Sequence, residues 1–283
     1  KKLYLKKSTL KKAPLKGNSM QLNNKNILLT GATGGIGKAI ASRLSIAGAT
    51  VSLVGRNRST LSPLLDSIGP QHHLMVADIN SPEGRSAIAE HCALKAIDVV
   101  INCAGVLEFG LYEEQAQSAV ETMITTNLLS PMLLCQQLIA PLKLRPEAAI
   151  INVGSIFGSI GHPGFTAYCA SKHGLRGFTE ALQRELADTV IRIGYLAPRA
   201  TDTDFNSAQV VALNQALGNN MDSPELVAAE LIKLLESSQM QRFMGWPEKL
   251  FVKINGLLPN LVGRSLIKNL PIIKRYSKLS SGE

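Results

Sequence analysis

Short apolar runs, each followed by a longer stretch of helical periodicity, recur along most of this chain. The runs that read as strands are NILLT (26–30), TVSLVG (50–55), HHLMVA (72–77), IDVVIN (97–102), AAIINVG (148–154) and VIRIGYL (190–196). The helical patterns lie at 36–48, 59–67, 83–94, 114–143 and 166–188. Strands that are apolar on both faces are typical of a parallel sheet covered by helices. The alternation therefore predicts a single α/β domain with a doubly wound parallel sheet and helices on both faces.

The sequence TGATGGIG, residues 30–37, joins the first predicted strand to the first predicted helix. Because glycine has no Cβ, the backbone at Gly31, Gly35 and Gly37 can turn tightly and approach a phosphate group closely. The N-terminus of the following helix presents free N–H groups to the negative charge of that phosphate. In this strand–turn–helix context, the glycines predict a Rossmann-like dinucleotide-binding site; a plain loop is the alternative.

The end of the second predicted strand favours NADP(H) over NAD(H). An NAD site usually places Asp or Glu there to bind the 2′-hydroxyl group of the ribose. This chain instead has Gly55 and Arg56, and Arg58 follows as a weaker candidate. A guanidinium group can bind a 2′-phosphate through two charge-assisted hydrogen bonds. The alternative is that Arg56 is an ordinary solvated surface residue.

The net charge of +9 is concentrated at the two ends of the chain. Residues 1–19 hold seven Lys and no acid, residues 241–283 hold eight Lys or Arg and two Glu, and the segment between them carries −4. A nucleic-acid-binding body would show a basic stripe across the fold, so we expect no nucleic-acid partner. We expect residues 1–19 to be a basic, disordered extension, because Met20 reads like a natural start just before the first strand; a functional basic arm is the alternative.

Seven short signatures stand in order along the chain. They are TGATGGIG (30–37), ADI (77–79), NCAG (102–105), TTN (125–127), INVGS (151–155), YCASK (168–172) and PRATDTDF (198–205). With this set the chain resembles the short-chain dehydrogenase/reductase family over roughly residues 22–245. The resemblance implies an NAD(P)-dependent oxidoreductase that interconverts a ketone or aldehyde with an alcohol by hydride transfer. It also implies a homo-oligomer. The cysteines read as reduced thiols in a reducing compartment, so we expect a cytoplasmic protein, with association with a membrane as the alternative.

The resemblance implies a catalytic set of four residues. Asn127 would hold a water molecule in a proton relay, and Ser155 would hydrogen-bond the substrate carbonyl. Tyr168 would be the general acid in reduction and the general base in oxidation. Lys172 would bind the ribose of the nicotinamide and lower the pKa of the tyrosine. The cofactor contacts that the resemblance implies are Thr30, Gly31, Thr33, Gly35, Ile36, Gly37, Arg56, Asp78, Ile79, Asn102, Ala104, Gly105, Lys172, Pro198 and Thr203.

The spacing of Tyr168 and Lys172 agrees with these roles. Positions i and i+4 share one face of a helix, so the two side chains point the same way. A free phenol has a pKa near 10, which is too high for a good base at neutral pH. The neighbouring ammonium group and the positive charge of an oxidised nicotinamide both favour the phenolate, so we expect the tyrosine pKa to be lowered.

Three positions depart from the family pattern. Cys103 stands where Asn is usual, and Gly34 fills a position that is often basic in relatives that use NADP, which weakens the preference for NADP(H). Arg199 follows Pro198 where Gly is usual. Arg199 is expected either to face solvent or to contact an anionic group on the cofactor or substrate.

The C-terminal segment 247–279 is apolar and basic, and prolines interrupt it at 259 and 271. Its apolar residues recur at helical spacing, with lysines between them. Such a segment can lie on an anionic membrane surface, pack on a partner subunit, or cover the substrate pocket as a lid. Each of these arrangements favours an apolar or lipid-like carbonyl or alcohol substrate.

The sequence therefore predicts a basic extension (1–19), an oxidoreductase domain (20–245) and an apolar, basic C-terminal extension (246–283). The expected reaction is NADPH-linked reduction of an apolar carbonyl, with His162 and Phe165 at the mouth of the pocket. The alternative is a non-catalytic dinucleotide-binding protein, or a membrane-surface protein, on the same fold. Neither a metal site nor a transmembrane helix is expected, and the four cysteines read as reduced, buried thiols.

Overall fold

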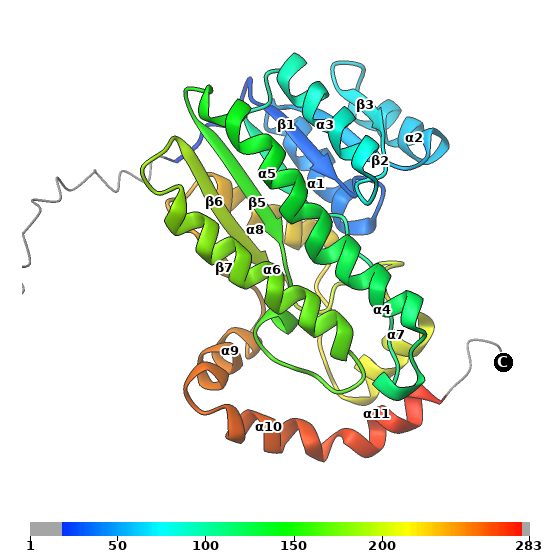
Figure 1. Ribbon diagram of the computed structural model, residues 1–283. Coiled ribbons are helices and arrows are strands. Elements are labelled where there is room, and N and C mark those ends of the chain that lie inside the picture. Colours follow the sequence, from blue (N-terminus) through cyan, green and yellow to red (C-terminus); the bar gives the residue numbers. More distant parts are fainter. Residues whose placement is uncertain (1–18, 279–283) are drawn as a thin grey trace, which may run out of the picture.

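The computed structural model describes residues 19–278, so the predicted basic extension lies almost entirely outside the described residues. Its strands form one parallel sheet in the order β3-β2-β1-β4-β5-β6-β7 (Figure 1). They are β1 (Asn26–Thr30), β2 (Thr50–Gly55), β3 (His73–Val76), β4 (Val99–Asn102), β5 (Ala148–Val153), β6 (Ile191–Ala197) and β7 (Gln241–Phe243). The order reverses between β1 and β4, where α/β sheets bind their ligands at the carboxyl ends of the strands. The predicted doubly wound α/β fold is confirmed.

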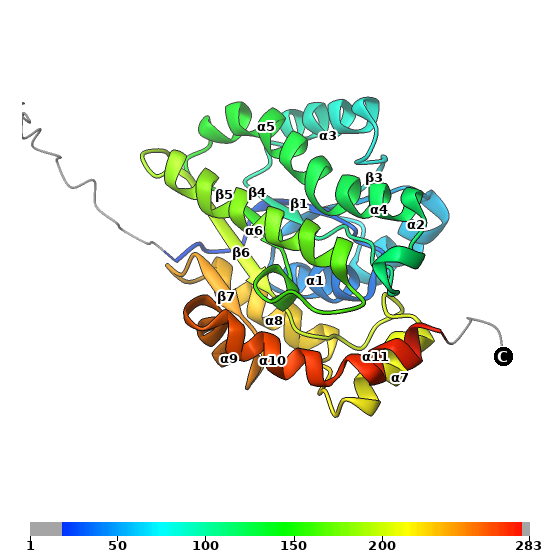
Figure 2. The ribbon, with the colours of Figure 1, turned by 60° about the horizontal axis from the view of Figure 1, so that its bottom comes forward.

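Helices cover both faces of the sheet (Figure 2). On one face, α1 (Gly35–Ile46), α2 (Arg58–Ile68) and α8 (Pro224–Leu235) bury their apolar side chains against the sheet. On the other face, α3 (Pro82–Leu94), α5 (Ser130–Lys143) and α6 (Thr166–Glu185) do the same. Each strand of the centre is therefore buried on both sides, as its unbroken run of apolar residues predicts.

The predicted helix at 114–143 is divided into several segments. A short 3₁₀ turn η1 (Tyr112–Glu114) precedes α4 (Gln117–Ile124), and a π-helical segment η2 (Thr125–Leu129) joins α4 to α5. Pro131, in the first turn of α5, has no N–H group and cannot make the α-helical hydrogen bond to the carbonyl of Asn127. Such π-helical segments are frequent at functional sites.

One helical stretch, Gln117–Lys143, is long and apolar enough to cross a membrane by length and composition alone, although the sequence pattern led us to expect none. In the fold, α4 packs on α6, and α5 packs on α3 and on strand β5. The stretch thus consists of α4, η2 and α5, which pack on the other helices and, through α5, on the sheet.

Three elements near the C-terminal part of the domain were not predicted. They are β7, α7 (Ala208–Ala216) and α8. Strand β7 has only three residues, QRF, so it carries no detectable alternation. It nevertheless pairs in parallel with β6 and completes the sheet.

The C-terminal segment folds into three consecutive helices, α9 (Glu248–Leu257), α10 (Pro259–Lys268) and α11 (Leu270–Ser277). Pro259 and Pro271 stand in the first turns of α10 and α11, where a helix does not need their missing N–H groups. Figure 1 shows the three helices in a row along one end of the molecule, with α11 beside α7. We call α9–α11 the cap.

Candidate active site

The glycine-rich turn after β1 is packed so closely that side chains are excluded at its key positions. Gly31 has a φ of +66°, and a Cβ there would lie 2.6 Å from the Cα of Ala104. A Cβ at Gly37 would lie 2.1 Å from the carbonyl oxygen of Gly31, and a Cβ at Gly35 would lie 2.4 Å from the Cγ2 of Thr203. The turn thus exposes bare backbone at the N-terminus of α1, as a site for a pyrophosphate requires. These residues fit a dinucleotide.

Thr30 and Ala104 hold the shape of this turn. The Thr30 hydroxyl group accepts hydrogen bonds from the backbone N–H groups of Cys103 (3.1 Å) and Ala104 (3.3 Å). Thr30 is 1% exposed, so its side chain ties β1 to the segment after β4 and does not face a ligand. Thr33 and Ile36 are half-buried, and Ile36 also lines the cavity described below.

The ends of β2 and β3 present the residues predicted to bind the adenosine part of the cofactor. Arg56 is exposed directly after β2, and among the described residues it forms no ion pair. Asp78 is exposed after β3, and its Oδ1 accepts a hydrogen bond from the backbone N–H of Asn80 at 2.9 Å. Ile79 is half-buried beside it. The predicted cofactor residues therefore lie along the carboxyl edge of the sheet.

Asn127 lies on the π-helical segment and is 1% exposed. Its Oδ1 accepts a hydrogen bond from the main-chain N–H of Val106 at 2.8 Å. Its Nδ2 donates to the main-chain carbonyl oxygen of Val106 (2.9 Å) and to the hydroxyl group of Ser171 (3.1 Å). Both amide hydrogens are thus engaged. A water molecule bound by Asn127 would have to use the second lone pair of Oδ1 or the main-chain carbonyl, which Pro131 leaves without its α-helical donor.

Tyr168 and Lys172 lie one turn apart on α6, and their side chains are buried in the same place. The Nζ of Lys172 lies 5.7 Å from the centroid of the Tyr168 ring and donates a hydrogen bond to the oxygen of Val153 at 3.2 Å. Ser155 stands just past β5, and its hydroxyl group lies near enough to Tyr168 to lower the pKa of the tyrosine. A Cβ at Gly105 would lie 3.2 Å from Asn127 Oδ1 and 3.6 Å from Lys172 Nζ, so Asn127 lies on the same side of the site as Lys172.

The protein groups alone shift the tyrosine pKa in the direction opposite to the one expected with an oxidised nicotinamide bound. Burial raises the pKa of Tyr168 well above its ordinary value, and the nearby hydroxyl group of Ser155 opposes this only in part. The ammonium group of Lys172 does not outweigh the burial. Burial also lowers the pKa of Lys172, to about 8. Tyr168 is therefore a protonated acid at neutral pH, and Lys172 is still largely charged.

A buried polar network that the sequence did not reveal connects the sheet to α6. The Nδ2 of Asn102 donates to the Oδ1 of Asn152 at 2.8 Å, and the Nδ2 of Asn152 donates to the hydroxyl group of Thr179 at 2.8 Å. Asn102 was expected to line the cofactor, but its side chain is turned into this network between β4 and β5. The network fixes α6, and with it Tyr168, relative to the sheet. Its partners are 27 to 50 positions apart in the chain, so no local pattern could indicate it.

Two further residues support the catalytic set. Tyr195 on β6 is fully buried. Its hydroxyl group accepts a hydrogen bond from the main-chain N–H of Ser155 and donates one to the main-chain carbonyl oxygen of Ser155, each at 3.3 Å. A Cβ at Gly154 would lie 2.1 Å from the Tyr195 ring. Asn80 bonds the hydroxyl groups of Thr126 (2.9 Å) and Ser130 (2.8 Å), on either side of Asn127.

A cavity of about 640 Å³ opens beside Tyr168 and Ser155. Pro198 and Thr203 line it on the cofactor side. An aromatic wall faces it, in which Phe157 stacks on His162 with ring centroids 5.0 Å apart and contacts Phe165 at 5.1 Å. The opposite wall belongs to the cap and includes Phe251, Ile254, Leu261, Val262 and Leu266. Of the arrangements considered for the C-terminal segment, the structure has the one in which it covers the pocket.

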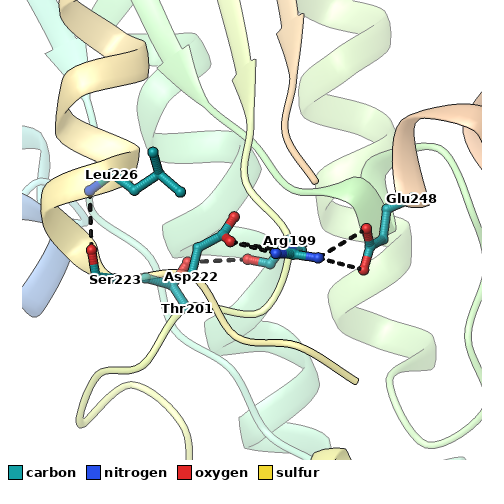
Figure 3. A network of polar contacts seen from close by, with 6 residues as sticks. All are labelled: Arg199, Thr201, Asp222, Ser223, Leu226 and Glu248. Carbon is teal, nitrogen blue, oxygen red and sulfur yellow. Dashed lines mark hydrogen bonds and ion pairs between the residues drawn. The ribbon is translucent and has the colours of Figure 1, made fainter. Parts of the chain in front are cut away.

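Arg199 meets neither expectation made for it. Its side chain is 16% exposed, and its guanidinium group lies between the carboxylates of Asp222 and Glu248 (Figure 3). The contact to Asp222 Oδ1 is 2.7 Å long and the contacts to Glu248 are 3.2 Å. Because both carboxylates neutralise it, Arg199 is engaged within the protein and is not available to a ligand anion.

Within residues 19–278, no group of three or more His, Cys, Asp or Glu side chains could hold a metal ion. The four cysteines are free thiols, and Cys103 is half-buried while the other three are buried. Burial raises the pKa of the Cys103 thiol to about 12, so it stays protonated beside the glycine-rich turn. The arrangement thus supports proton transfer by Tyr168 and binding of a dinucleotide.

Comparison with known proteins agrees with this geometry. A family model described as short chain dehydrogenase matches residues 25–213. Nodulation protein G of Rhizobium sp. (strain N33) is 31% identical over 225 residues, which span 77% of this chain and 92% of that protein. The 3-oxoacyl-[acyl-carrier-protein] reductase FabG of Pseudomonas aeruginosa is 33% identical over 218 residues, which span 75% of this chain and 88% of the relative.

Two solved structures share the fold. A short chain dehydrogenase from Burkholderia cenocepacia J2315 in complex with NADP has a TM-score of 0.77 at 22% identity and covers 87% of this chain and 99% of its own. A putative NAD(P) dependent gluconate 5-dehydrogenase from Beutenbergia cavernae, with bound NADP at low occupancy, has a TM-score of 0.72 at 27% identity and covers 79% and 95%. The chain belongs to the short-chain dehydrogenase/reductase family and is an NAD(P)-dependent oxidoreductase.

Proposed function

We propose that this protein uses NADPH to reduce an apolar ketone or aldehyde to the alcohol. The observation that carries the proposal is the position of Tyr168. Tyr168 and Ser155 both line a cavity whose walls are mostly apolar. A buried phenol that stays protonated at neutral pH suits the acid that reduction requires.

In the proposed reaction, a bound nicotinamide supplies the hydride that adds to the carbonyl carbon. Ser155 holds the carbonyl oxygen, and Tyr168 donates its hydroxyl proton to that oxygen as the alcohol forms. The phenolate left on Tyr168 is stabilised by the ammonium group of Lys172. Asn127 would pass a replacement proton through a water molecule at its main-chain carbonyl or at the free lone pair of Oδ1.

The preference for NADPH rests on Arg56. This exposed guanidinium group stands at the end of β2, where a carboxylate would select NAD, and it has no competing ion pair among the described residues. NADP is also the cofactor named with both structural relatives. In our proposal Arg56 binds the 2′-phosphate.

The substrate class rests on the cavity walls. Phe157, Phe165 and Phe251 line it, together with Leu261 and Leu266 from the cap. Apolar walls with a few polar groups at one end favour a ligand with a long apolar part and one carbonyl group. The relative in Pseudomonas aeruginosa is a reductase of a 3-oxoacyl substrate, which also combines an acyl chain with a ketone.

A panel of methyl ketones of increasing chain length would test the proposal. Purified protein is mixed with NADPH or NADH, and consumption of the reduced cofactor is followed by absorbance. We expect kcat/KM to rise with chain length and to fall by about 10³-fold in Tyr168→Phe, because the proton donor is lost. Tyr112→Phe, at an exposed position, is the matched control. Wild-type turnover no greater than that of Tyr168→Phe would favour the non-catalytic alternative.

A specific observation favours a second property, contact of the cap with an anionic membrane surface. Large apolar side chains are exposed within a short stretch of the chain, namely Trp246, Leu250, Phe251, Leu257, Leu258, Leu261 and Ile267. Exposed cations stand among them at Lys249, Lys253, Arg264 and Lys268, and none of these forms an ion pair with another described residue. Apolar and basic residues together suit an interface that contains anionic lipid.

Vesicle flotation would test this contact. We expect the protein to float with vesicles that contain phosphatidylglycerol and not with neutral vesicles. Replacing Leu257 and Leu258, which are 82% and 58% exposed, by serine should abolish flotation and leave turnover of a short ketone unchanged. If the wild-type protein stays in solution with anionic vesicles, the membrane contact is wrong. A homo-oligomeric state and a cytoplasmic location stay predictions.

A further inference from the structure

Arg199 touches two segments that belong to different parts of the molecule. Its Nε and Nη2 donate to Asp222 Oδ1 at 2.9 and 2.7 Å, and its Nη1 lies 3.2 Å from both carboxylate oxygens of Glu248 (Figure 3). Asp222 precedes α8, and Glu248 is the first residue of α9. One side chain thus joins the chain after β6, the chain before α8 and the start of the cap.

Asp222 closes a loop that forms one side of the cavity. Its main-chain N–H donates to the carbonyl oxygen of Ala200, and its main-chain carbonyl oxygen accepts from the N–H of Asp202, both at 2.9 Å. The two ends of segment 200–222 are therefore paired with each other, and α7 lies between them along the chain. We call residues 200–222 the substrate loop. Thr203, Phe205, Asn206 and Val210 of this loop line the cavity.

The structure leaves room for Arg199 to reach the cap. Gly245 has a φ of +83°, and a Cβ there would lie 2.6 Å from Arg199 Cδ and 2.6 Å from Glu248 Oε2. Any side chain at this position would push the arginine and the glutamate apart. The glycine, the arginine and the glutamate thus form one fitted contact at the start of the cap.

The far end of the cap is attached to the same loop. Ile273 on α11 is fully buried in a cluster with Val210 and Leu213 of α7. The cap therefore contacts the substrate loop at its first helix through charge and at its last helix through apolar packing. Between these two attachments, α9 and α10 form a wall of the cavity.

We propose that Arg199 is a positioning residue that fastens the cap to the substrate loop through Glu248 and Asp222, so that the two close over an apolar substrate as one unit. This rests on the proposed function for the identity of the substrate. Arg199 would act through the wall that it holds, without touching the reacting atoms. Loss of the attachment at Glu248 frees only the start of the cap, so it should weaken binding of long ligands and spare short ones.

Glu248→Gln is the decisive variant, because it removes one charge and keeps the shape of the side chain. Arg199→Met also leaves the carboxylate of Asp222 buried without its cation, so its effects would include misfolding. The readout of binding is the fluorescence of Trp246, the one tryptophan of the chain, which lies two residues before Glu248. The probe is 2-dodecanone, titrated into the protein saturated with NADP⁺.

We expect Glu248→Gln to raise the Kd of 2-dodecanone by about fivefold, as for loss of a partly buried ion pair. The Kd of NADP⁺ and the turnover of 2-butanone should stay within about twofold of the wild-type values. In the wild type, added salt should weaken binding of 2-dodecanone, and in Glu248→Gln it should have less effect. Hydrogen–deuterium exchange of α9 should be faster in the variant.

Glu147→Gln is the matched control, because it removes the ion pair with Lys25 (3.1 Å) at the amino ends of the strands, away from the cap. Unchanged exchange of α9 in Glu248→Gln would overturn the attachment. Faster exchange with an unchanged Kd of 2-dodecanone would overturn the positioning role. Failure of the proposed function would appear separately, as absence of NADPH consumption by the wild type, and the exchange experiment would still decide on the attachment.

Discussion

The ammonium nitrogen of Lys172 donates a hydrogen bond to the main-chain oxygen of Val153 at 3.2 Å, although the lysine is only 4% exposed. This bond ties the middle of α6 to the end of β5, beside Ser155. Within the described residues no carboxylate forms an ion pair with this lysine, and burial lowers its pKa from 10.5 to about 8. The protein therefore keeps a cation at a position where the cation opposes folding.

The first prediction concerns the pH dependence of stability. Below pH 8, Lys172 is charged in both the folded and the unfolded chain, and the full cost of burying the charge is present. Between about pH 8 and 10.5 the unfolded chain binds more protons than the folded one, so this contribution makes stability rise with pH. The shift from 10.5 to about 8 corresponds to about 3 kcal/mol.

Urea unfolding of the wild type and of Lys172→Met between pH 7 and 10.5 would measure this contribution. The free energy of unfolding of the wild type minus that of the variant should increase by about 3 kcal/mol over this range. Tyrosines and cysteines also titrate in the unfolded chain over this range. Taking the difference between the two proteins removes their contribution to the pH dependence of the free energy of unfolding. A difference that does not change with pH would contradict the lowered pKa of Lys172.

The second prediction concerns the glycine-rich turn. A Cβ at Gly35 would lie 2.4 Å from the Cγ2 of Thr203, so Gly35→Ala should displace the loop that carries Thr203 and raise the Kd of NADPH by at least about tenfold. Gly34→Ala is the control, because a Cβ at Gly34 makes one ordinary contact of 3.5 Å. Fluorescence titration with NADPH checks both variants. Equal affinity in the two would show that the space at Gly35 is not needed for the cofactor.

The third prediction concerns the network beneath α6. Asn152 is completely buried and bonds both Asn102 and Thr179. Asn152→Ala leaves the Asn102 amide without its oxygen acceptor and opens a small cavity, so the free energy of unfolding should fall by about 3 kcal/mol. Thr179→Ser keeps the hydroxyl group and should cost much less. Chemical denaturation measures both; a loss below about 1 kcal/mol in Asn152→Ala would mean that the network is unimportant for stability.

The parts of the fold predictable from the sequence are those that depend on neighbouring residues. Unbroken apolar runs such as those of β1 and β5 indicate strands that are buried on both faces, and the glycines of residues 30–37 indicate a tight turn before a helix. The spacing of Tyr168 and Lys172 is likewise local. Ser155 could be expected near them because it directly follows a predicted strand, and parallel strands of such a sheet end at the same edge.

The features that the sequence did not reveal depend on contacts between distant segments or on burial. Arg199 binds Asp222 and Glu248, which are 23 and 49 positions away, and nothing near Arg199 in the chain indicates either partner. Strand β7 is too short to show a pattern. The effect of burial on the Tyr168 pKa was not predicted, because the charge of Lys172 is visible in the sequence, whereas the depth of burial is not.

The last prediction concerns the choice of cofactor. Arg56→Ala should raise the Kd of NADPH by about 30-fold, because it removes charge-assisted hydrogen bonds to the 2′-phosphate, and should leave the Kd of NADH within about twofold. Arg58→Ala, two positions along the same exposed segment, should have a much smaller effect. Titration of nicotinamide fluorescence at low and high salt measures all three proteins, and salt should weaken NADPH binding more in the wild type than in Arg56→Ala. If Arg56→Ala keeps the wild-type ratio of the two affinities, the 2′-phosphate is bound elsewhere or NADPH is not the preferred cofactor.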